Sequence, residues 1–323
     1  MRKVVAAALT LLAAVGVAHA GEQPIRLGLL AFGTVQWEIA TMRADGLDAA
    51  HGVRVEPVQT AGKDGAAVAL LGGTVDAMVS DWLWVSRQRA MGRDLTFVPY
   101  STMTGALLVP AGSPIRGIAD LKGKRIGVAG GPLDKGWLLL RALAERQAGL
   151  DLARQARAVF GAPPLLAQQF QAGRLDAVLT FWQAALPLEA AGARRLIEVA
   201  AIPAQLGIDS RIPLVGWVFH RAWADAHADT VRAFLAAETE TRHRLCSDPA
   251  AWRSLDPLTH ATDEPTRQAL RRGFCAGIPT AWGPRQRRDA ASLFAVLARM
   301  GGADLVGPRP QLQDGTFWPG ISY

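Results

Sequence analysis

Apolar and polar positions follow two patterns along residues 25–200. Short apolar runs such as residues 25–30 are typical of strands buried on both faces. Longer segments such as residues 134–147 carry apolar residues at helical spacing and predict helices. Further strands are expected at residues 53–58, 77–80, 95–100, 125–129, 156–160, 177–181 and 195–200, and further helices at residues 35–49, 66–71 and 164–171. Strands that alternate with helices predict an α/β fold with parallel sheets covered on both faces.

The chain contains an internal repeat. Residues 73–82 (GTVDAMVSDW) share Gly, Asp, Ala and Trp with residues 173–182 (GRLDAVLTFW), at an offset of 100. The strand at residues 26–29 (RLGL) has a counterpart at residues 125–128 (RIGV), at an offset of 99. Two matched windows at nearly the same offset predict two lobes built on one plan.

The two lobes must be joined, and two extended apolar segments lie between them in the sequence. Residues 105–110 and 213–219 are therefore expected to form the two crossing strands of a hinge, which would allow closure around a ligand. The expected division places residues 21–108 and 214–323 in the first lobe and residues 109–213 in the second. The tail is expected to return to the first lobe, with helices at residues 230–244, 264–276 and 284–300.

The first twenty residues predict a secretory signal peptide. Arg2 and Lys3 form a positive start, residues 4–17 are apolar or small, and Ala18 and Ala20 supply small residues before the cleavage site. Cleavage is expected after Ala20, with export to the periplasm. The alternative, a membrane anchor, is disfavoured because a spanning helix needs ~20 apolar residues.

Charge and cysteines add little to this picture. Without the leader the chain keeps 33 basic and 28 acidic residues, a formal charge of +5. The arginines do not form the clustered stripe that nucleic-acid binding requires, so no nucleic-acid partner is expected. An exported protein can form a disulfide between Cys246 and Cys275. The sequence does not show whether their Cα atoms come within ~6 Å, so a bridge and two free thiols both remain open.

No catalytic motif is present in the sequence. It contains neither Gly-x-Ser-x-Gly nor His-Glu-x-x-His, and the glycine-rich residues 127–131 lack the lysine of a phosphate-binding loop. The histidines of the mature chain are too dispersed to suggest a metal site. We therefore expect no enzymatic activity, no metal and no cofactor.

Three segments resemble a known family of transport proteins. They are residues 72–77 (GGTVDA), 112–128 (GSPIRGIADLKGKRIGV) and 223–235 (WADAHADTVRAFL), and the likeness extends over residues 25–235. The chain resembles the substrate-binding proteins of nitrate-, sulfonate- and taurine-type ABC transporters, including the branch that binds a thiamine pyrimidine precursor. Residues 118–128 are the most specific segment, although they also occur in related binding-protein families.

This resemblance implies a type II periplasmic binding protein fold, with two doubly wound lobes joined by a two-strand hinge. It also implies a small-molecule ligand and delivery to an ABC permease at the inner membrane; we expect a monomer. Two alternatives remain. One is a solute-sensing protein that docks on a membrane receptor. The other is an enzyme of the thiamine-pyrimidine-precursor synthase type, whose cysteine-rich iron-binding motif is missing from this sequence.

Loops at the carboxyl ends of the strands are the candidate ligand site, because ligands of such sheets bind there. Glycines in these loops let backbone N–H groups approach a ligand, and indoles provide flat apolar walls. The candidates in the first lobe are Phe32, Gly33, Thr34, Gln36, Trp37, Gly62, Ser80, Asp81, Trp82, Ser101 and Thr102. Those in the second lobe are Gly130, Gly131, Asp134, Gly161, Phe181 and Trp182.

The matched indoles and the charges near these loops refine the expected site. Trp82 and Trp182 occupy equivalent positions in the repeat, and at least one of them is expected to line the cleft. Glu38 and Asp81 are acidic, and Lys135 is the nearest base. A small inorganic anion in a dry site normally requires a charge-assisted donor. The resulting hypothesis is an organic ligand with an aromatic or amine-bearing part, which binds in preference to taurine or nitrate.

Overall fold

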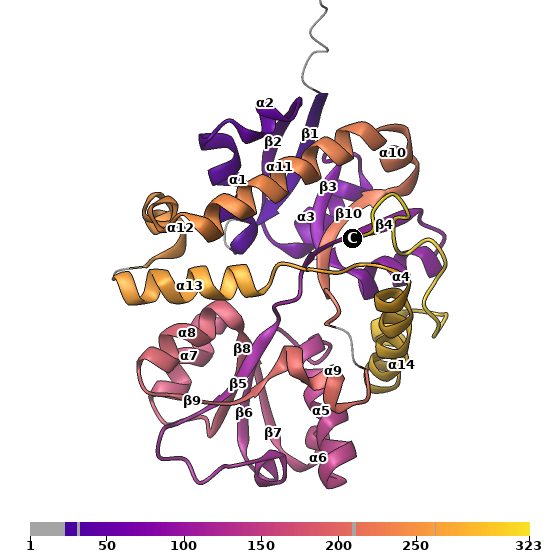
Figure 1. The fold of residues 1–323 in the computed structure, drawn as a ribbon. Coiled ribbons are helices and arrows are strands. Elements are labelled where there is room, and N and C mark those ends of the chain that lie inside the picture. The colour runs from indigo at the N-terminus through magenta and orange to yellow at the C-terminus, as the bar shows by residue number, and fades with distance from the viewer. Residues whose placement is uncertain (1–22, 31–32, 209–210, 262) are drawn as a thin grey trace, which may run out of the picture.

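The computed structural model describes residues 23–30, 33–208, 211–261 and 263–323. The expected signal peptide and Phe32 lie outside the described residues. The described chain forms two lobes, each a five-stranded sheet flanked by helices (Figure 1). This architecture confirms the prediction of a two-lobed α/β fold.

Each sheet contains one antiparallel strand. The first sheet has the order β2-β1-β3-β10-β4, and the second has the order β7-β6-β8-β5-β9. The strands of the first sheet are β1 (Gln23–Leu30), β2 (Val53–Thr60), β3 (Ala77–Asp81), β4 (Leu95–Ser101) and β10 (Val215–His220). Those of the second are β5 (Gly105–Val109), β6 (Arg125–Ala129), β7 (Arg157–Gly161), β8 (Ala177–Phe181) and β9 (Arg194–Glu198). Because β10 and β5 run antiparallel to both of their neighbours, the expectation of purely parallel sheets is wrong.

The segments expected to cross between the lobes are strands within the sheets. β5 pairs with β8 and β9 of the second sheet, whereas β10 pairs with β3 and β4 of the first. The first crossing therefore lies at residues 102–104, between β4 and β5, and the second lies before Val215. The expected boundary after residue 108 falls inside a strand of the second lobe.

Helices cover the sheets of both lobes. The first lobe has α1 (Thr34–Ala44), α2 (Leu47–Ala50), α3 (Lys63–Leu71), α4 (Trp82–Ala90), α10 (Arg221–Ala226), α11 (Ala228–Ser247), η3 (Pro249–Leu255), α12 (Asp256–Thr259) and α13 (Glu264–Ala276). The second has η1 (Ile118–Leu121), α5 (Lys135–Ala148), α6 (Leu152–Gln155), α7 (Pro163–Gln171), α8 (Trp182–Ala190), η2 (Val199–Ala201) and α9 (Ile202–Gln205). The helix expected at residues 35–49 is divided into α1 and α2, because Gly46 has φ 67° and ends the first helix.

The internal repeat extends to individual ion pairs. In the first lobe the Arg26 guanidinium binds the Asp76 carboxylate, with Nη2–Oδ1 2.6 Å and Nε–Oδ2 3.0 Å. In the second lobe Arg125 binds Asp176 in the same way, with distances of 2.7 and 3.2 Å. In both lobes the aspartate also accepts a hydrogen bond from the backbone N–H of its arginine. The repeated windows thus correspond to equivalent corners of the two lobes.

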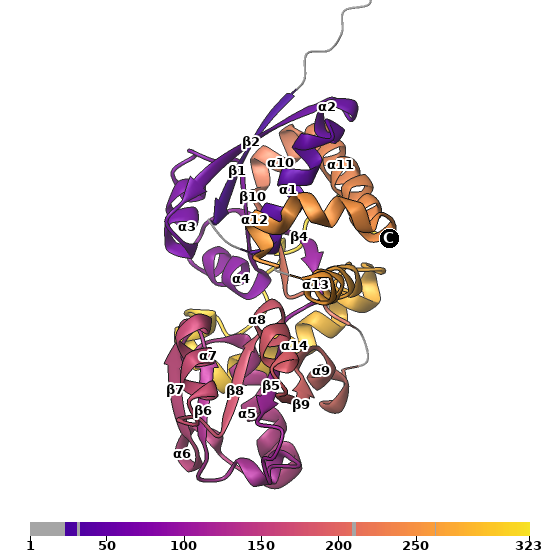
Figure 2. The same cartoon turned by 90° about the vertical axis from the view of Figure 1, so that its left-hand side faces the viewer.

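The tail bridges the lobes instead of returning only to the first. Helix α14 (Pro284–Val306) packs on α4 of the first lobe and on α5 of the second. Arg87 from α4 donates to the carbonyl of Asp304 at 3.0 Å, and Arg141 from α5 donates to that of Met300 at 3.1 Å. Helix α13 packs on α8 of the second lobe, so both helices lie at the waist between the lobes (Figure 2).

A disulfide joins Cys246 of α11 to Cys275 of α13, with a Cα–Cα distance of 5.8 Å. It resolves the question that the sequence left open and fixes α13 to the first lobe. Among the described residues, no helix has the length and apolar character needed to cross a membrane.

Candidate functional site

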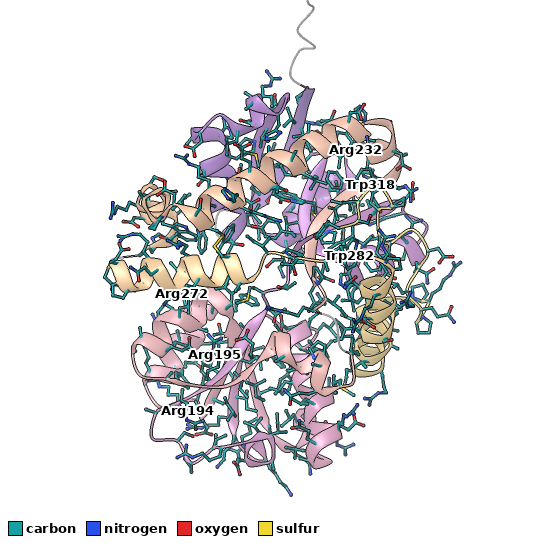
Figure 3. The ribbon with its side chains drawn as sticks, in the orientation of Figure 1. Arg194, Arg195, Arg232, Arg272, Trp282 and Trp318 are labelled. Atoms are coloured by element: carbon teal, nitrogen blue, oxygen red, sulfur yellow. A yellow bond between two sulfur atoms is a disulfide. The ribbon has the colours of Figure 1, made fainter. Side chains whose placement is uncertain are left out.

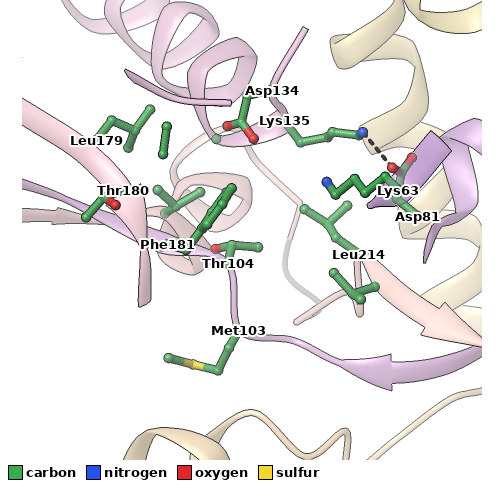
Figure 4. Close-up of a pocket in the computed structure, with 15 residues that line it drawn as sticks. Lys63, Asp81, Met103, Thr104, Asp134, Lys135, Leu179, Thr180, Phe181 and Leu214 are labelled. Atoms are coloured by element: carbon green, nitrogen blue, oxygen red, sulfur yellow. Dashed lines mark ion pairs between the residues drawn. The ribbon is translucent and has the colours of Figure 1, made fainter. Parts of the chain in front are cut away.

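A pocket of about 130 Å³ lies between the lobes beside the two crossings (Figure 4). Met103 and Thr104 of the first crossing line it, as does Leu214 of the second. The remaining lining residues are Lys63, Asp81 and Val215 from the first lobe, and Gly105, Ala129, Asp134, Lys135, Gly136, Leu179, Thr180, Phe181 and Val199 from the second. The pocket therefore lies at the carboxyl ends of β3, β6 and β8, where the sequence predicted a site.

An ion pair connects the two lobes within this pocket. The Lys135 ammonium at the start of α5 lies 2.5 Å from Oδ2 of Asp81 at the start of α4. The other oxygen of Asp81 accepts the backbone N–H of Trp84 at 2.9 Å and caps α4. Burial alone would raise the pKa of Asp81, but Lys135 outweighs this effect and holds the pKa below its ordinary value. Asp81 is therefore ionised, and it holds the lobes together through Lys135.

The pocket contains a second base and a second acid. The ammonium of Lys63 is directed into the pocket (Figure 4); it makes no direct ion pair or hydrogen bond with a described residue, although its charge acts to lower the pKa of both Asp81 and Asp134. Lys63 is the first residue of α3, where a positive charge opposes the helix dipole, so helix stability does not explain its position. Asp134 caps α5 by accepting the N–H of Trp137, and burial raises its pKa above the ordinary value.

Two threonine hydroxyls in the pocket lack hydrogen-bond partners. Thr180 Oγ1 is buried, with only 3% of the residue exposed, and forms no hydrogen bond to any described residue. The same is true of Thr104 Oγ1 at the crossing. Buried polar atoms are nearly always paired, so these two hydroxyls are well suited to contact a polar ligand. Phe181 and Leu179 provide an apolar wall beside them.

Trp182 closes the cleft on the side opposite α14. Its indole lies edge-on to Trp37, with 6.1 Å between the ring centroids, in a cluster with Trp252 and Phe274 of the first lobe. Gly273 of α13 makes this approach possible, because a Cβ at that position would lie 2.3 Å from the Trp182 ring. Trp182 is thus a side chain of the second lobe that inserts into an aromatic socket of the first.

The structure distributes the predicted site residues over several environments. Asp81, Asp134 and Phe181 line the main pocket. Thr34, Ser101 and Trp182 line a smaller cavity beside it, Ser80 lines a neighbouring cavity, and Thr102 lines another at the crossing. The residues that line none of these cavities are Gly33, Gln36, Trp37, Gly62, Trp82, Gly130, Gly131 and Gly161.

The two matched tryptophans have different environments. Trp82 is fully buried, donates to the carbonyl of Pro213 at 3.0 Å, and packs on Phe294 and Phe317 of the tail. It supports the second crossing and does not line the cleft, because the tail covers it. Trp182 instead packs on α13 of the opposite lobe, at Gly273.

Sequence reasoning missed two polar residues of the pocket, Lys63 and Thr104, whereas Thr180 belongs to the candidate loop at residues 180–182. Lys63 directly follows the candidate Gly62, so the first turn of the helix should have been considered together with its loop. The expectation that Lys135 is the nearest base is therefore incomplete. Lys135 is paired with Asp81, and the base available to a ligand is Lys63.

Comparison with solved structures identifies the class of fold. The alkanesulfonate-binding protein SsuA from Xanthomonas axonopodis pv. citri bound to MOPS has a TM-score of 0.68 and 20% identity, over 93% of this chain and 99% of that chain. The periplasmic aliphatic sulphonate binding protein SsuA from Escherichia coli has a TM-score of 0.74 and 18% identity, over 92% of both chains. The desulfurization enzyme DSZB has a TM-score of 0.56 and 16% identity, over 92% of this chain and 97% of that chain. The chain has the type II periplasmic binding protein fold.

The family follows from the sequence comparison. The family model described as NMT1/THI5 like matches residues 42–251, more than half of the chain. The protein belongs to the NMT1/THI5-like family, in agreement with the resemblance noted in its sequence. No curated protein matches the chain significantly.

Proposed function

We propose that the protein is the periplasmic solute-binding subunit of an ABC importer. It captures a small organic solute between its lobes and delivers it to a permease at the inner membrane. The interlobe pocket is the main support for this proposal. An unpaired ammonium on Lys63 and an unpaired, buried hydroxyl on Thr180 face a space that both lobes enclose. The names of the two sulfonate-binding neighbours support the same role.

The pocket favours a ligand with an acidic group. Lys63 supplies a charge-assisted donor, and the hydroxyls of Thr104 and Thr180 supply further hydrogen bonds. Phe181 and Leu179 suit an apolar carbon chain next to that group. Small organic sulfonates are therefore the first candidates. The hypothesis of an amine-bearing or aromatic ligand was based on the absence of an available base, and Lys63 is such a base.

Export and partners complete the proposal. The signal peptide at residues 1–20 would direct the chain to the periplasm with cleavage after Ala20. A monomer would present both lobes to the permease, with residues 102–104 near the lobe boundary. N-terminal sequencing of the exported protein tests the first point, with Gly21 expected as the first residue.

The central experiment identifies the solute and tests its site. Native mass spectrometry of protein purified from the periplasm should reveal a bound small molecule, and calorimetric titration with 1-propanesulfonate, taurine and nitrate should show which acidic group binds. Lys63→Gln should weaken binding of the tightest ligand about 10-fold, the value of one charge-assisted hydrogen bond. Lys122→Gln, at an exposed position outside the pocket, is the matched control. A protein that binds no solute in either measurement would contradict the proposal.

The same preparation separates a binding protein from an enzyme. DSZB shares the fold, so the fold alone does not exclude chemistry. Among the described residues, no group of three or more His, Cys, Asp or Glu is placed to hold a metal ion. A binding protein should release its solute chemically unchanged after prolonged incubation. A product detected by mass spectrometry would favour the enzymatic alternative.

A further inference from the structure

A second, smaller cavity adjoins the main pocket and shares Met103 with it. Its volume of about 10 Å³ is close to that needed for one water-sized group. Its other lining residues are Thr34, Glu38, Tyr100, Ser101, Arg242, Phe274, Gly277 and Ile278 from the first lobe and Trp182 from the second. The cavity is therefore a recess in the first lobe that Trp182 covers when the lobes are together.

Three side chains of this recess carry buried atoms without hydrogen bonds. Tyr100 Oη, Glu38 Oε1 and Arg242 Nη2 satisfy no hydrogen-bond geometry with a described residue, although the Thr34 hydroxyl, which lines the same recess, lies within interaction range of Tyr100. All three residues are more than nine-tenths buried. Arg242 does lie near carboxylates, with Nε 3.2 Å from Glu38 Oε1 and Nη2 2.9 Å from Glu238 Oε1. Arg242 Nε donates to Glu38 Oε2 at 3.3 Å, whereas Glu38 Oε1 and Arg242 Nη2 keep unused hydrogen-bonding capacity, which is rare in a protein interior.

The charges around the recess exclude an ionic occupant. Burial raises the pKa of both Glu38 and Glu238, against the attraction of Arg242, so this carboxyl pair retains a proton more readily than free carboxyls do. Arg242 lies beside both carboxyls and balances the charge that remains on them. The Arg242 guanidinium also covers the Tyr100 ring, 4.7 Å from its centroid, which leaves this face unavailable to an ammonium group. An additional cation or anion would therefore be a buried charge without compensation, which is costly.

We infer that this recess is a subsite of the cleft that binds a hydroxyl group of the solute, with Tyr100 as its hydrogen-bonding contact and Trp182 as its cover. A hydroxyl is uncharged, fits the space of a single non-hydrogen atom, and both donates and accepts hydrogen bonds. The inference rests on the proposed function, because it specifies which residues bind the end of the solute that lies opposite the acidic group. The solute would then extend from Lys63 past Met103 to Tyr100.

Three sulfonates of equal chain length test the assignment. 2-Hydroxyethanesulfonate, 1-propanesulfonate and taurine end in a hydroxyl, a methyl and an ammonium group. Calorimetry should show that the hydroxyl compound binds about 10-fold more tightly than the other two, the value of one hydrogen bond to a matched site. Tyr100→Phe removes only the phenolic oxygen and should reduce this preference to less than about 3-fold. Tyr323→Phe, the only other tyrosine of the chain, lies outside the recess and should preserve it.

The remaining outcomes are also decisive. Equal affinity for the hydroxyl and methyl compounds would mean that the recess holds only a water molecule, and tighter binding of taurine would mean that it accepts a cation; either result overturns the inference. If no probe binds, the solute found by native mass spectrometry decides. A solute that contains a hydroxyl and is lost from Tyr100→Phe but retained by Tyr323→Phe supports the subsite. A solute without a hydroxyl overturns the subsite while the proposed function stands. A protein without any solute overturns both.

Discussion

Replacing Gly273 by alanine should open the cleft without unfolding the protein. A Cβ at this position would lie 2.3 Å from Cζ3 and 2.7 Å from Cε3 of Trp182. Carbon atoms in contact normally stay at about 3.5–4.0 Å, so the indole and α13 must separate by more than about 1 Å. Overpacking of this kind costs about 1–3 kcal/mol. Because Gly273 belongs to the first lobe and Trp182 to the second, separation of the lobes relieves the strain.

The expected effect on closure follows from this energy. A penalty of about 1–3 kcal/mol on the closed arrangement lowers its population relative to the open one about 5- to 150-fold, and weakens ligand binding accordingly. The fold itself should not be weakened, since alanine favours a helix over glycine by about 1 kcal/mol. Small-angle X-ray scattering should report a larger radius of gyration for the ligand-free variant, and urea unfolding should report an unchanged or higher stability.

Two further variants make this prediction specific. Arg272→Ala changes the exposed neighbour of Gly273 on the same helix (Figure 3) and should leave both scattering and affinity unchanged. Gly273→Ala combined with Trp182→Leu removes the clashing ring and should restore the compact scattering profile. If Gly273→Ala kept the wild-type radius and lost stability instead, the strain would be absorbed within the first lobe, and Trp182 would not be a separable contact between the lobes.

Three further predictions concern the ion pair, the disulfide and the buried acid. Lys135→Gln removes the partner of Asp81 and should destabilise the closed state by about 1–2 kcal/mol, which weakens ligand affinity about 5- to 30-fold. The difference in affinity between the variant and the wild type should shrink in high salt. An unchanged affinity at low salt would contradict a bridging role for Lys135. Replacing Cys246 and Cys275 by serine opens a loop with a sequence separation of 29 residues and should lower the free energy of unfolding by about 3–4 kcal/mol in urea titrations, while reducing agent should affect only the wild type. Burial raises the pKa of Glu38 from 4.5 to about 8, so its stabilising contribution is complete below pH 4.5 and is lost as the pH rises through 8. Between pH 5 and 8, wild-type stability should therefore fall relative to Glu38→Gln by up to about 1.4 kcal/mol per pH unit, and parallel stability profiles would refute this assignment.

The sequence was sufficient to predict the lobes because their signals are local. Apolar runs and helical spacing recur within short windows, and the repeated windows correspond to equivalent corners that contain Arg26–Asp76 and Arg125–Asp176. The antiparallel strands β5 and β10 could not be recognised in this way. Their direction depends on how the chain enters the other sheet, and an apolar run has the same composition in either direction.

The candidate site was predictable only in part, for a similar reason. Asp81, Asp134 and Phe181 follow strands directly, so the rule about carboxyl ends of strands finds them. Thr104 lies on a crossing whose position depends on the sheet pairing. Trp82 satisfies the same rule as Trp182, but residues from the tail, more than 200 positions away, bury it. Equivalent positions in a repeat predict equivalent backbone structure. They do not determine which residues surround the side chain.

This difference between the matched tryptophans also determines how the cleft can move. On one side of the waist, Trp82 supports the second crossing through Pro213 and packs on Phe294 of α14, and α14 in turn contacts both lobes. On the other side, α8 and α13 meet through Trp182 and Gly273, and the first crossing runs beside them: Thr102 N–H donates to the Gly277 carbonyl at 2.8 Å, and Trp182 N–H donates to the Thr104 carbonyl at 3.3 Å. Each side of the waist therefore has one backbone crossing beside it, and the α14 side has in addition a helix that contacts both lobes. Opening should therefore rotate Trp182 away from Gly273 about residues 102–104, which uncovers the recess of Tyr100.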